Sequence, residues 1–252
     1  MSLEPSRTRP AAYGRRRWAQ ALPRPRISKA SGASAPAADD AGRAFDASGV
    51  PLRVVTAASL FDGHDAAINV MRRLIQSSGA EVIHLGHDRS AKDVVDCAVQ
   101  EDAHAVALTS YQGGHMEYFT YIRQLLDEAG CEHIRIFGGG GGTITPPEIR
   151  DLHKSGISKI YSPDDGRKMG LMGMIHDLMG TASEVDLIAD SRIQSLDGPI
   201  TADDMAKVGL LMTLSESATT DECKETLDKV RSSDNDVPVI GFTGTGGAGK
   251  SR

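Results

Sequence analysis

The feature that most constrains this chain is a regular alternation of short apolar runs with helical periods, which begins at residue 52. Between the runs, apolar residues recur at the i, i+3, i+4, i+7 spacing of an amphipathic helix, as in Ala91, Val94, Val95 and Ala98. The runs themselves are rich in β-branched residues and have the length of buried strands: residues 52–59, 81–86, 105–110, 134–138 and 159–162. Five strand–helix units in succession predict an α/β domain with a parallel sheet and helices on both faces.

Capping residues support the expected helix starts. Ser90 precedes Asp93 by three residues, Thr145 precedes a proline and Glu148, and Ser162 also precedes a proline. With strands this short, we expect the flavodoxin-like (Rossmann-like) order, in which the first and third strands lie side by side at the switch point. Ligands of such folds bind beyond the carboxyl ends of the strands. We assign this domain to residues 50–180.

The charge is unevenly distributed along the chain. Residues 1–38 carry eight Lys or Arg and one Glu, whereas the remainder carries 20 basic and 33 acidic residues. The first 49 residues, rich in Arg, Pro and Ala, have no sustained apolar period and are predicted to be disordered. A transit peptide is the alternative for this segment, although its prolines would interrupt an amphipathic helix. The acidic body argues against a nucleic-acid partner.

Composition also bears on the compartment. No run approaches the ~20 apolar residues of a membrane span. The three cysteines, Cys97, Cys131 and Cys223, are odd in number and widely spaced, which is typical of reduced thiols rather than of a disulfide framework. We therefore expect a cytoplasmic protein without a membrane partner.

The C-terminal part contains a second motif. Residues 181–235 are expected to form a helical linker, with helices over 201–216 and 219–231, and 237–243 are expected to form a buried strand. A pattern typical of a phosphate-binding loop follows: Gly244, Gly246, Gly247, Ala248, Gly249, Lys250 and Ser251. Its N–H groups would cradle phosphates, Lys250 would reach the β/γ oxygens, and Ser251 would bind Mg²⁺. The alternative is a flexible glycine-rich tail. Because the helix that completes such a site would begin at Lys250, we expect residues 236–252 to be the truncated start of a G domain in a longer protein.

Unusual residues follow four of the expected strands, and the fold places them on one edge of the sheet. These residues are Asp62, Gly63, His64, Asp65 and Ala66 after the first strand, Ser110, Tyr111, Gln112 and Gly113 after the third, Gly139, Gly140 and Gly141 after the fourth, and Ser162 after the fifth. The carboxylate of Asp62 can orient the ring of His64 for metal binding; alternatively, Asp62 simply caps the next helix. Five consecutive glycines allow a bulky ligand to approach the backbone.

The other histidines do not suggest zinc. His64, His84, His87 and His115 lack a paired-ligand spacing on one element, and His84 and His87 are interpreted as surface or hydrogen-bonded histidines. One nitrogen ligand beside a glycine-lined crevice instead suits a large planar metal cofactor with a tail.

The amino-acid sequence around these residues resembles that of the cobalamin-binding domain of adenosylcobalamin-dependent acyl-CoA mutases, and in particular that of the fused isobutyryl-CoA mutase branch. The resemblance covers about residues 52–251 and rests on the segments beginning at Leu60, Ser110 and Tyr161 together with the glycine run. It implies that His64 is the lower cobalt ligand and that Asp62 holds its other ring nitrogen. It also implies that the displaced nucleotide tail lies against Ser110 and the glycine floor. Ala67 and Gln112 depart from the wider family pattern and match the fused branch.

The resemblance also implies the function of the whole protein. In that family, adenosylcobalamin supplies an adenosyl radical, a barrel domain binds the acyl-CoA, and isobutyryl-CoA and n-butyryl-CoA are interconverted. A fused G domain would use GTP and Mg²⁺ as a chaperone for cofactor loading, and the full-length protein would be a homodimer. This piece alone is expected to contain no catalytic residue and not to turn over. The alternatives are a corrinoid methyl carrier, a cobalamin-sensing domain, or a metal-free flavodoxin-like domain such as a receiver, which would need an Asp where Ser110 stands.

Overall fold

The structure is a computed structural model of the whole chain, and it describes residues 42–196, 200–201, 203–217, 221–231, 241 and 243. The expected strand over 237–243 falls almost entirely outside these residues, as does the phosphate-binding pattern of 244–251. Most of the segment predicted to be disordered, residues 1–41, also lies outside them.

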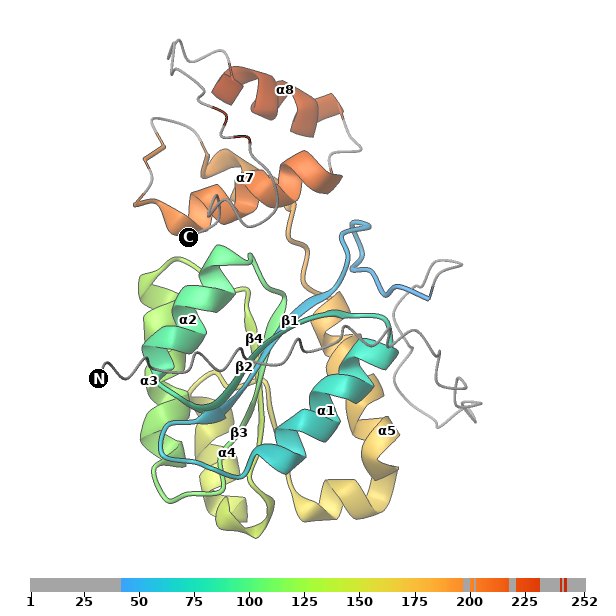
Figure 1. Cartoon of the computed structure of the whole chain (residues 1–252), viewed down its shortest axis with the longest axis vertical. Coiled ribbons are helices and arrows are strands. Elements are labelled where there is room, and N and C mark those ends of the chain that lie inside the picture. The colour runs from blue at the N-terminus through green and yellow to red at the C-terminus, as the bar shows by residue number, and fades with distance from the viewer. Residues whose placement is uncertain are drawn as a thin grey trace, which may run out of the picture. The chain divides into compact units, whose positions relative to one another are not determined.

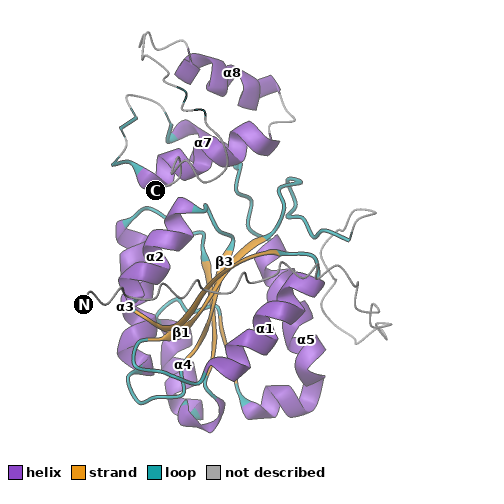
Figure 2. Ribbon diagram, in the orientation of Figure 1, coloured by secondary structure: helices purple, strands orange, loops and turns teal. Residues whose placement is uncertain are grey.

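A five-stranded parallel sheet forms the centre of the described chain (Figure 2). Its spatial order is β2-β1-β3-β4-β5, so β1 and β3 are neighbours, as the flavodoxin-like order predicts. The strands are β1 (Arg53–Ser59), β2 (Glu81–Arg89), β3 (Ala105–Thr109), β4 (Arg135–Gly139) and β5 (Lys159–Tyr161). The prediction of a parallel α/β sheet with helices on both faces is confirmed.

Helices cover both faces of this sheet, with α1 and α5 on one face and α2, α3 and α4 on the other (Figure 1). Their bounds are α1 (Asp65–Ser77), α2 (Ala91–Gln100), α3 (His115–Glu128), α4 (Pro146–Lys154) and α5 (Pro163–Ser183). A short 3₁₀ turn, Gly141–Thr143, lies between β4 and α4. Each crossover helix therefore follows a carboxyl strand end, which brings the loops after the strands to one edge.

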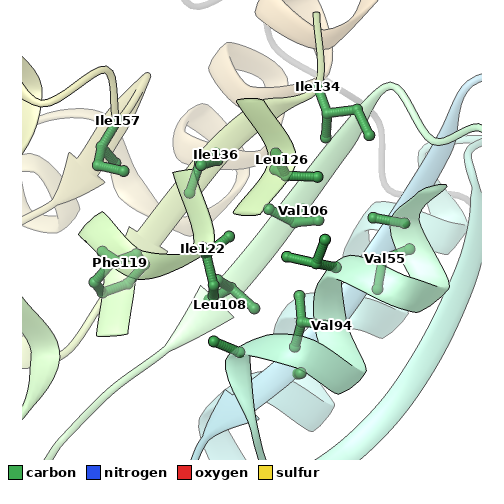
Figure 3. Close-up of a cluster of buried hydrophobic side chains, with 14 of the residues drawn as sticks. Val55, Val94, Val106, Leu108, Phe119, Ile122, Leu126, Ile134, Ile136 and Ile157 are labelled. Atoms are coloured by element: carbon green, nitrogen blue, oxygen red, sulfur yellow. The ribbon is translucent and has the colours of Figure 1, made fainter. Parts of the chain in front are cut away.

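Side chains that alternate along the strands feed two cores. Val55, Val106, Leu108 and Ile136 pack with α2 and α3 in the larger core, where Phe119, Ile122 and Leu126 are fully buried (Figure 3). The opposite faces of the same strands pack against α1 and α5. The second core contains Val54, Ala105, Ala107, Phe137, Ile75, Ile175 and Met179. Because β1 and β3 are buried on both faces, they are continuous apolar runs rather than alternating ones.

The expected helix caps are present. Ser90, Thr145 and Ser162 each form a capping box with the acidic residue three positions later. Helix α5 is broken at Gly170, whose φ of 68° and ψ of 172° are accessible only to glycine. The segment before Gly170 therefore runs in a different direction from the segment after it (Figure 1).

Strand β2 is longer than predicted. The sequence suggested an end at Gly86, but pairing with β1 continues to Arg89, which lies opposite Ser59. The register shifts near Gly86, which has a φ of 90° and absorbs the irregularity. A glycine that was interpreted as the end of the strand is instead part of a bulge that carries the strand on.

Residues 42–49 were assigned to the disordered tail, and here the structure differs. Phe45 forms an antiparallel bridge with Pro51, and Ala44 is fully buried. The carboxylate of Asp46 is buried, accepts hydrogen bonds from the N–H groups of Ser48 and Val50, and lies 3.2 Å from Nε2 of His104. These are polar contacts of a short irregular segment, so apolar periodicity gave no sign of them.

The domain continues past residue 180, and the linker helices begin after it. Val185 and Leu187 are buried against Val50, so this end of the domain also extends beyond the expected boundary. Three helices follow: α6 (Asp190–Gln194), α7 (Met205–Ser217) and α8 (Asp221–Arg231). They agree with the expected helical linker, and the proposed cap at Thr219 lies outside the described residues. Within the described part of the chain, no helix is both long and apolar enough to cross a membrane.

Candidate functional site

His64 and Asp62 lie in the loop between β1 and α1, at the carboxyl edge of the sheet. The Nδ1 atom of His64 is 2.7 Å from Oδ1 of Asp62, which also accepts a hydrogen bond from the His64 N–H. The second carboxylate oxygen accepts the N–H of Tyr111 from the β3–α3 loop at 2.6 Å. Asp62 therefore binds the two loops of the switch point together.

Burial differs sharply between the two side chains. The carboxylate of Asp62 is fully buried, whereas 71% of the His64 side chain is exposed. Burial alone would raise the pKa of Asp62, but hydrogen bonds from the N–H groups of Tyr111 and His64 and from the His64 ring hold that pKa below its ordinary value. An ionised carboxylate can only accept, so Nδ1 of His64 carries a proton, and in the neutral imidazole the lone pair is then on Nε2.

The geometry does not support the alternative in which Asp62 caps the next helix. The N-cap of α1 is His64 itself, and no side chain caps that helix. The carboxylate of Asp62 is bonded to His64 and Tyr111 instead. An exposed imidazole whose Nδ1 is held by a buried carboxylate suits a metal ligand.

The turn that carries these residues is held from the β3–α3 loop. The Ser59 hydroxyl donates to Oγ of Ser110 at 2.9 Å, and both side chains are fully buried. The Gln112 side chain donates through Nε2 to the Leu60 carbonyl at 3.1 Å and accepts the N–H of Gly114 through Oε1 at 2.8 Å. Ser110 and Gln112 thus fix the backbone around His64.

A cavity of about 570 Å³ opens beside His64, between α1, α5 and the ends of β3, β4 and β5. Its walls are mostly apolar and include Met71 and Ile75 of α1 and Leu171 and Met174 of α5. Tyr111 connects it to the histidine, because its ring lines the cavity and lies 5.3 Å from the His64 ring, centroid to centroid. The Tyr111 ring is therefore the contact between the His64 ring and the lining of the cleft.

The glycines from Gly138 to Gly142 differ in what a side chain would meet at each position. A Cβ on Gly138 would meet the Phe119 ring at 2.4 Å, and one on Gly140 would meet the Ser110 carbonyl oxygen at 2.0 Å, so these two glycines permit close packing within the domain. Gly139 and Gly142 have room for a Cβ, and Gly141 has a φ of 57°. The segment from Gly138 to Gly141 lines the cavity, which leaves its floor free of side chains.

The residues expected at the site fall into two groups. Six of them line the cavity: Ala66, Tyr111, Gly139, Gly140, Gly141 and Ser162. The others do not line it and lie in the loops after β1 and β3 or, for Asp65, at the start of α1: Asp62, Gly63, His64, Asp65, Ser110, Gln112 and Gly113. The nucleotide-binding residues Gly244, Gly246, Gly247, Ala248, Gly249, Lys250 and Ser251 lie outside the described residues.

Sequence reasoning missed the apolar walls of the cavity. The period of Leu171, Met174, Ile175 and Leu178 indicated a helix, and all four residues line the cleft. Leu171 is 40% exposed, which is unusual for a large apolar residue that continues a buried stripe. A helical period cannot reveal which side chains face a ligand and which face the sheet.

The remaining histidines agree with the sequence interpretation. Nδ1 of His84 lies 2.9 Å from Oγ1 of Thr56, and burial, together with nearby Arg72, lowers the pKa of the ring. His87 is exposed on β2. Over the described ranges, no three His, Cys, Asp or Glu side chains come together as a metal site.

Comparison with known proteins gives the family. The family model described as "B12 binding domain" matches residues 52–162. A fused isobutyryl-CoA mutase of Geobacillus kaustophilus is 49% identical over 207 residues, covering 79% of this chain and 19% of that protein. A fused isobutyryl-CoA mutase of Cupriavidus metallidurans is 49% identical over 225 residues, covering 89% of this chain and 20% of that protein.

A shorter relative matches over most of its own length. The 2-hydroxyisobutanoyl-CoA mutase small subunit of Aquincola tertiaricarbonis is 31% identical over 115 residues, covering 45% of this chain and 82% of that protein. The chain spans about a fifth of the length of the fused mutases that it matches. These similarities, together with the parallel sheet and the Asp62–His64 pair, show that the chain belongs to the B12-binding domain family of the acyl-CoA mutases.

Proposed function

We propose that this chain is the cobalamin-binding module of an adenosylcobalamin-dependent acyl-CoA mutase, with His64 as the lower cobalt ligand. The observation that carries the proposal is the exposed side chain of His64. Its ring is held through Nδ1 by a fully buried carboxylate at 2.7 Å. The hydrogen bond fixes the tautomer and raises the basicity of the free nitrogen, which favours coordination of a metal.

The cavity supports the second half of the proposal. An apolar cleft of about 570 Å³ with a floor of glycines suits the nucleotide tail of a cobalamin, which must leave the metal when a histidine replaces its base. Ala66, Tyr111 and Ser162 line this cleft, and Gly139 and Gly141 would let the tail approach the backbone. The protein's part is to bind, orient and shield; cobalamin, when bound, supplies the radical chemistry.

For the whole protein we infer the activity of the fused relatives. The substrate would be isobutyryl-CoA or n-butyryl-CoA, bound by a barrel domain that is not in this chain. The phosphate-binding pattern ending at Ser251 would begin a GTP- and Mg²⁺-dependent chaperone domain. A cytoplasmic homodimer without nucleic-acid or membrane partners is our working assembly. Two fused isobutyryl-CoA mutases are 49% identical to this chain and cover 79% and 89% of it, which supports this choice over a methyl carrier or a sensor.

The test is a spectral titration of the purified 252-residue chain with hydroxocobalamin and with adenosylcobalamin. We expect the visible spectrum of a cobalamin whose own base is displaced and replaced by a histidine. His64→Ala should abolish the histidine-bound spectrum. His87→Ala is the matched control, because His87 is exposed on β2, and it should leave the spectrum unchanged.

Three results would each count against a part of the proposal. Absence of cobalamin binding by the wild-type chain would reject the module assignment. Tight binding with the same histidine-bound spectrum in the His64→Ala variant would reject the ligand assignment and keep the module. Conversion of acyl-CoA must be measured on a full-length protein with its barrel domain, and a full-length protein inactive on isobutyryl-CoA would reject the substrate assignment.

A further inference from the structure

Phe61, directly before the Asp62-x-His64 segment, has a backbone conformation that is unfavourable for its residue type. Its φ is 63°, in the left-handed region that favours glycine or asparagine, and its side chain is 83% exposed. It occupies the turn closed by the hydrogen bond from the Asp62 N–H to the Ser59 carbonyl, 3.0 Å long. A bulky residue keeps such a conformation only when neighbouring groups hold it there.

Asp88 provides that restraint. Its Oδ1 accepts the N–H of Phe61 at 2.7 Å, a short hydrogen bond to a charged acceptor. Asp88 also has a positive φ, of 56°, which aspartate tolerates better than most residues because of its short polar side chain. Two residues with a positive φ, one in the turn after β1 and one near the end of β2, are thus joined by one hydrogen bond.

The position of Asp88 follows from the irregular end of β2. The bulge at Gly86 carries the strand on to Arg89, opposite Ser59, so the carboxylate reaches the turn after β1. The buried hydroxyl of Tyr118 donates to the Arg89 carbonyl at 2.9 Å, and Ser90 caps the following helix. Asp88 is therefore presented from a segment that is fixed on both sides.

The turn determines where the Asp62 carboxylate lies. On one side Gln112 donates to the Leu60 carbonyl, and on the other Asp88 accepts from Phe61. The next residue along is Asp62, whose two oxygens bond His64 and Tyr111. We propose that Asp88 is a positioning residue for the cobalt-ligating histidine, acting through the turn at Phe61 and the carboxylate of Asp62. This inference rests on the proposed function of His64.

The clearest test is the pH at which the histidine leaves the cobalt of bound hydroxocobalamin. Protons compete with cobalt for Nε2 of His64, so weaker ligation moves this midpoint to higher pH. Asp88→Gly removes the acceptor and still tolerates the positive φ. We expect the midpoint to rise by about half to one pH unit, corresponding to roughly three- to tenfold weaker ligation.

Two further variants separate positioning from charge and from strain. Asp88→Asn loses the same charge but keeps an acceptor and tolerates the left-handed conformation, so its midpoint should stay close to that of the wild type. Phe61→Asn relieves the strain in the turn, and in that background the effect of Asp88→Gly should fall to less than half. Asp88 is exposed and outside both cores, so none of these variants should prevent folding.

A cofactor-free readout keeps the inference independent of cobalamin binding. Amide hydrogen exchange at Tyr111 in the apo chain reports the hydrogen bond to Asp62, and it should accelerate about three- to tenfold in Asp88→Gly and not in Asp88→Asn. An unchanged midpoint together with unchanged exchange at Tyr111 in Asp88→Gly would overturn the proposal. Equal effects of Gly and Asn would also overturn it in favour of a charge effect. If the wild-type chain shows no histidine ligation, the proposed function fails, while altered exchange would still assign Asp88 to the turn.

Discussion

Gly140 and Ser110 approach so closely that a Cβ on the glycine would lie 2.0 Å from the Ser110 carbonyl oxygen. The contact joins the loops after β3 and β4 at the edge where His64 is presented. Both partners are backbone, so neither can move aside by changing a side-chain rotamer. The close approach belongs to the construction of the edge as well as to the cavity floor.

We expect Gly140→Ala to destabilise the apo chain by about 3 kcal/mol, because overlap with a backbone atom forces the two loops apart. The midpoint of thermal unfolding should fall by roughly 6–12 °C. Gly142→Ala is the control, since a Cβ there meets nothing within 4 Å, and its midpoint should change little. Equal stability of the two variants would show that the edge relaxes without cost.

Lowering the pH should show that Asp62 is ionised in the folded chain. Its pKa lies below the ordinary value of 3.8, so its contribution to stability is present above that pH and is lost as pH falls through the folded-state pKa. Asp62→Asn should therefore be less stable than the wild type by about 2 kcal/mol at pH 7, and the difference should shrink as the pH falls below 3.8. Urea unfolding at a series of pH values measures this.

Asp65→Asn serves as the control for that series, because Asp65 is exposed and starts α1 without a buried partner. Its stability difference from the wild type should be small at every pH. A constant offset for Asp62→Asn across the series would contradict the assignment of an ionised, hydrogen-bonded carboxylate.

We expect the Asp46 carboxylate to contribute strongly to the stability of the segment that begins the domain. Asp46→Ala leaves the buried His104 ring and the Val50 N–H without their acceptor, and we expect a loss of about 3 kcal/mol in the free energy of unfolding. Ser48→Ala removes one partly buried hydroxyl partner of the same carboxylate and should lose less than about 1 kcal/mol. Denaturant unfolding distinguishes the two, and equal losses would contradict a special role for the carboxylate.

Filling the cavity should block cobalamin without unfolding the chain. Ala67 lies in the first turn of α1 and lines the cleft, so Ala67→Phe places a ring in the space available to the nucleotide tail. We expect at least about tenfold weaker binding of hydroxocobalamin, since the tail would lose its apolar contacts. Arg73→Phe on the exposed side of the same helix is the control. An unchanged affinity of Ala67→Phe for hydroxocobalamin would show that the cavity does not hold the nucleotide tail.

The sheet could be predicted because its strands are short apolar runs separated by capped helices. The order with β1 beside β3, and the meeting of their loops, followed from that pattern. The continuation of β2 past Gly86 could not be predicted, because a strand end and a bulge both favour glycine. The sequence therefore gives no indication that Asp88 lies beside the turn after β1.

The spacing of two residues between Asp62 and His64 predicts their pairing. In the structure, Nδ1 of His64 lies 2.7 Å from Oδ1 of Asp62. The roles of Gln112 and Asp46 could not be found from periodicity, because Gln112 bonds the Leu60 carbonyl and Asp46 lies against the His104 ring, and both partners are far away in the sequence. The nucleotide-binding pattern from Gly244 to Ser251 stays a prediction, as do the cobalt and nucleotide-tail contacts.

The break in α5 at Gly170 separates two stretches of that helix beside the cleft. Ile175 and Leu178, after the break, line the cleft and are also buried in the second core, whereas Gly166, before it, lines the cleft. Because the two stretches do not share one helical axis, a change in the direction of the first stretch does not have to displace the apolar face that the second packs against the sheet. The part of the cleft wall before Gly170 can therefore be altered while the core remains in place.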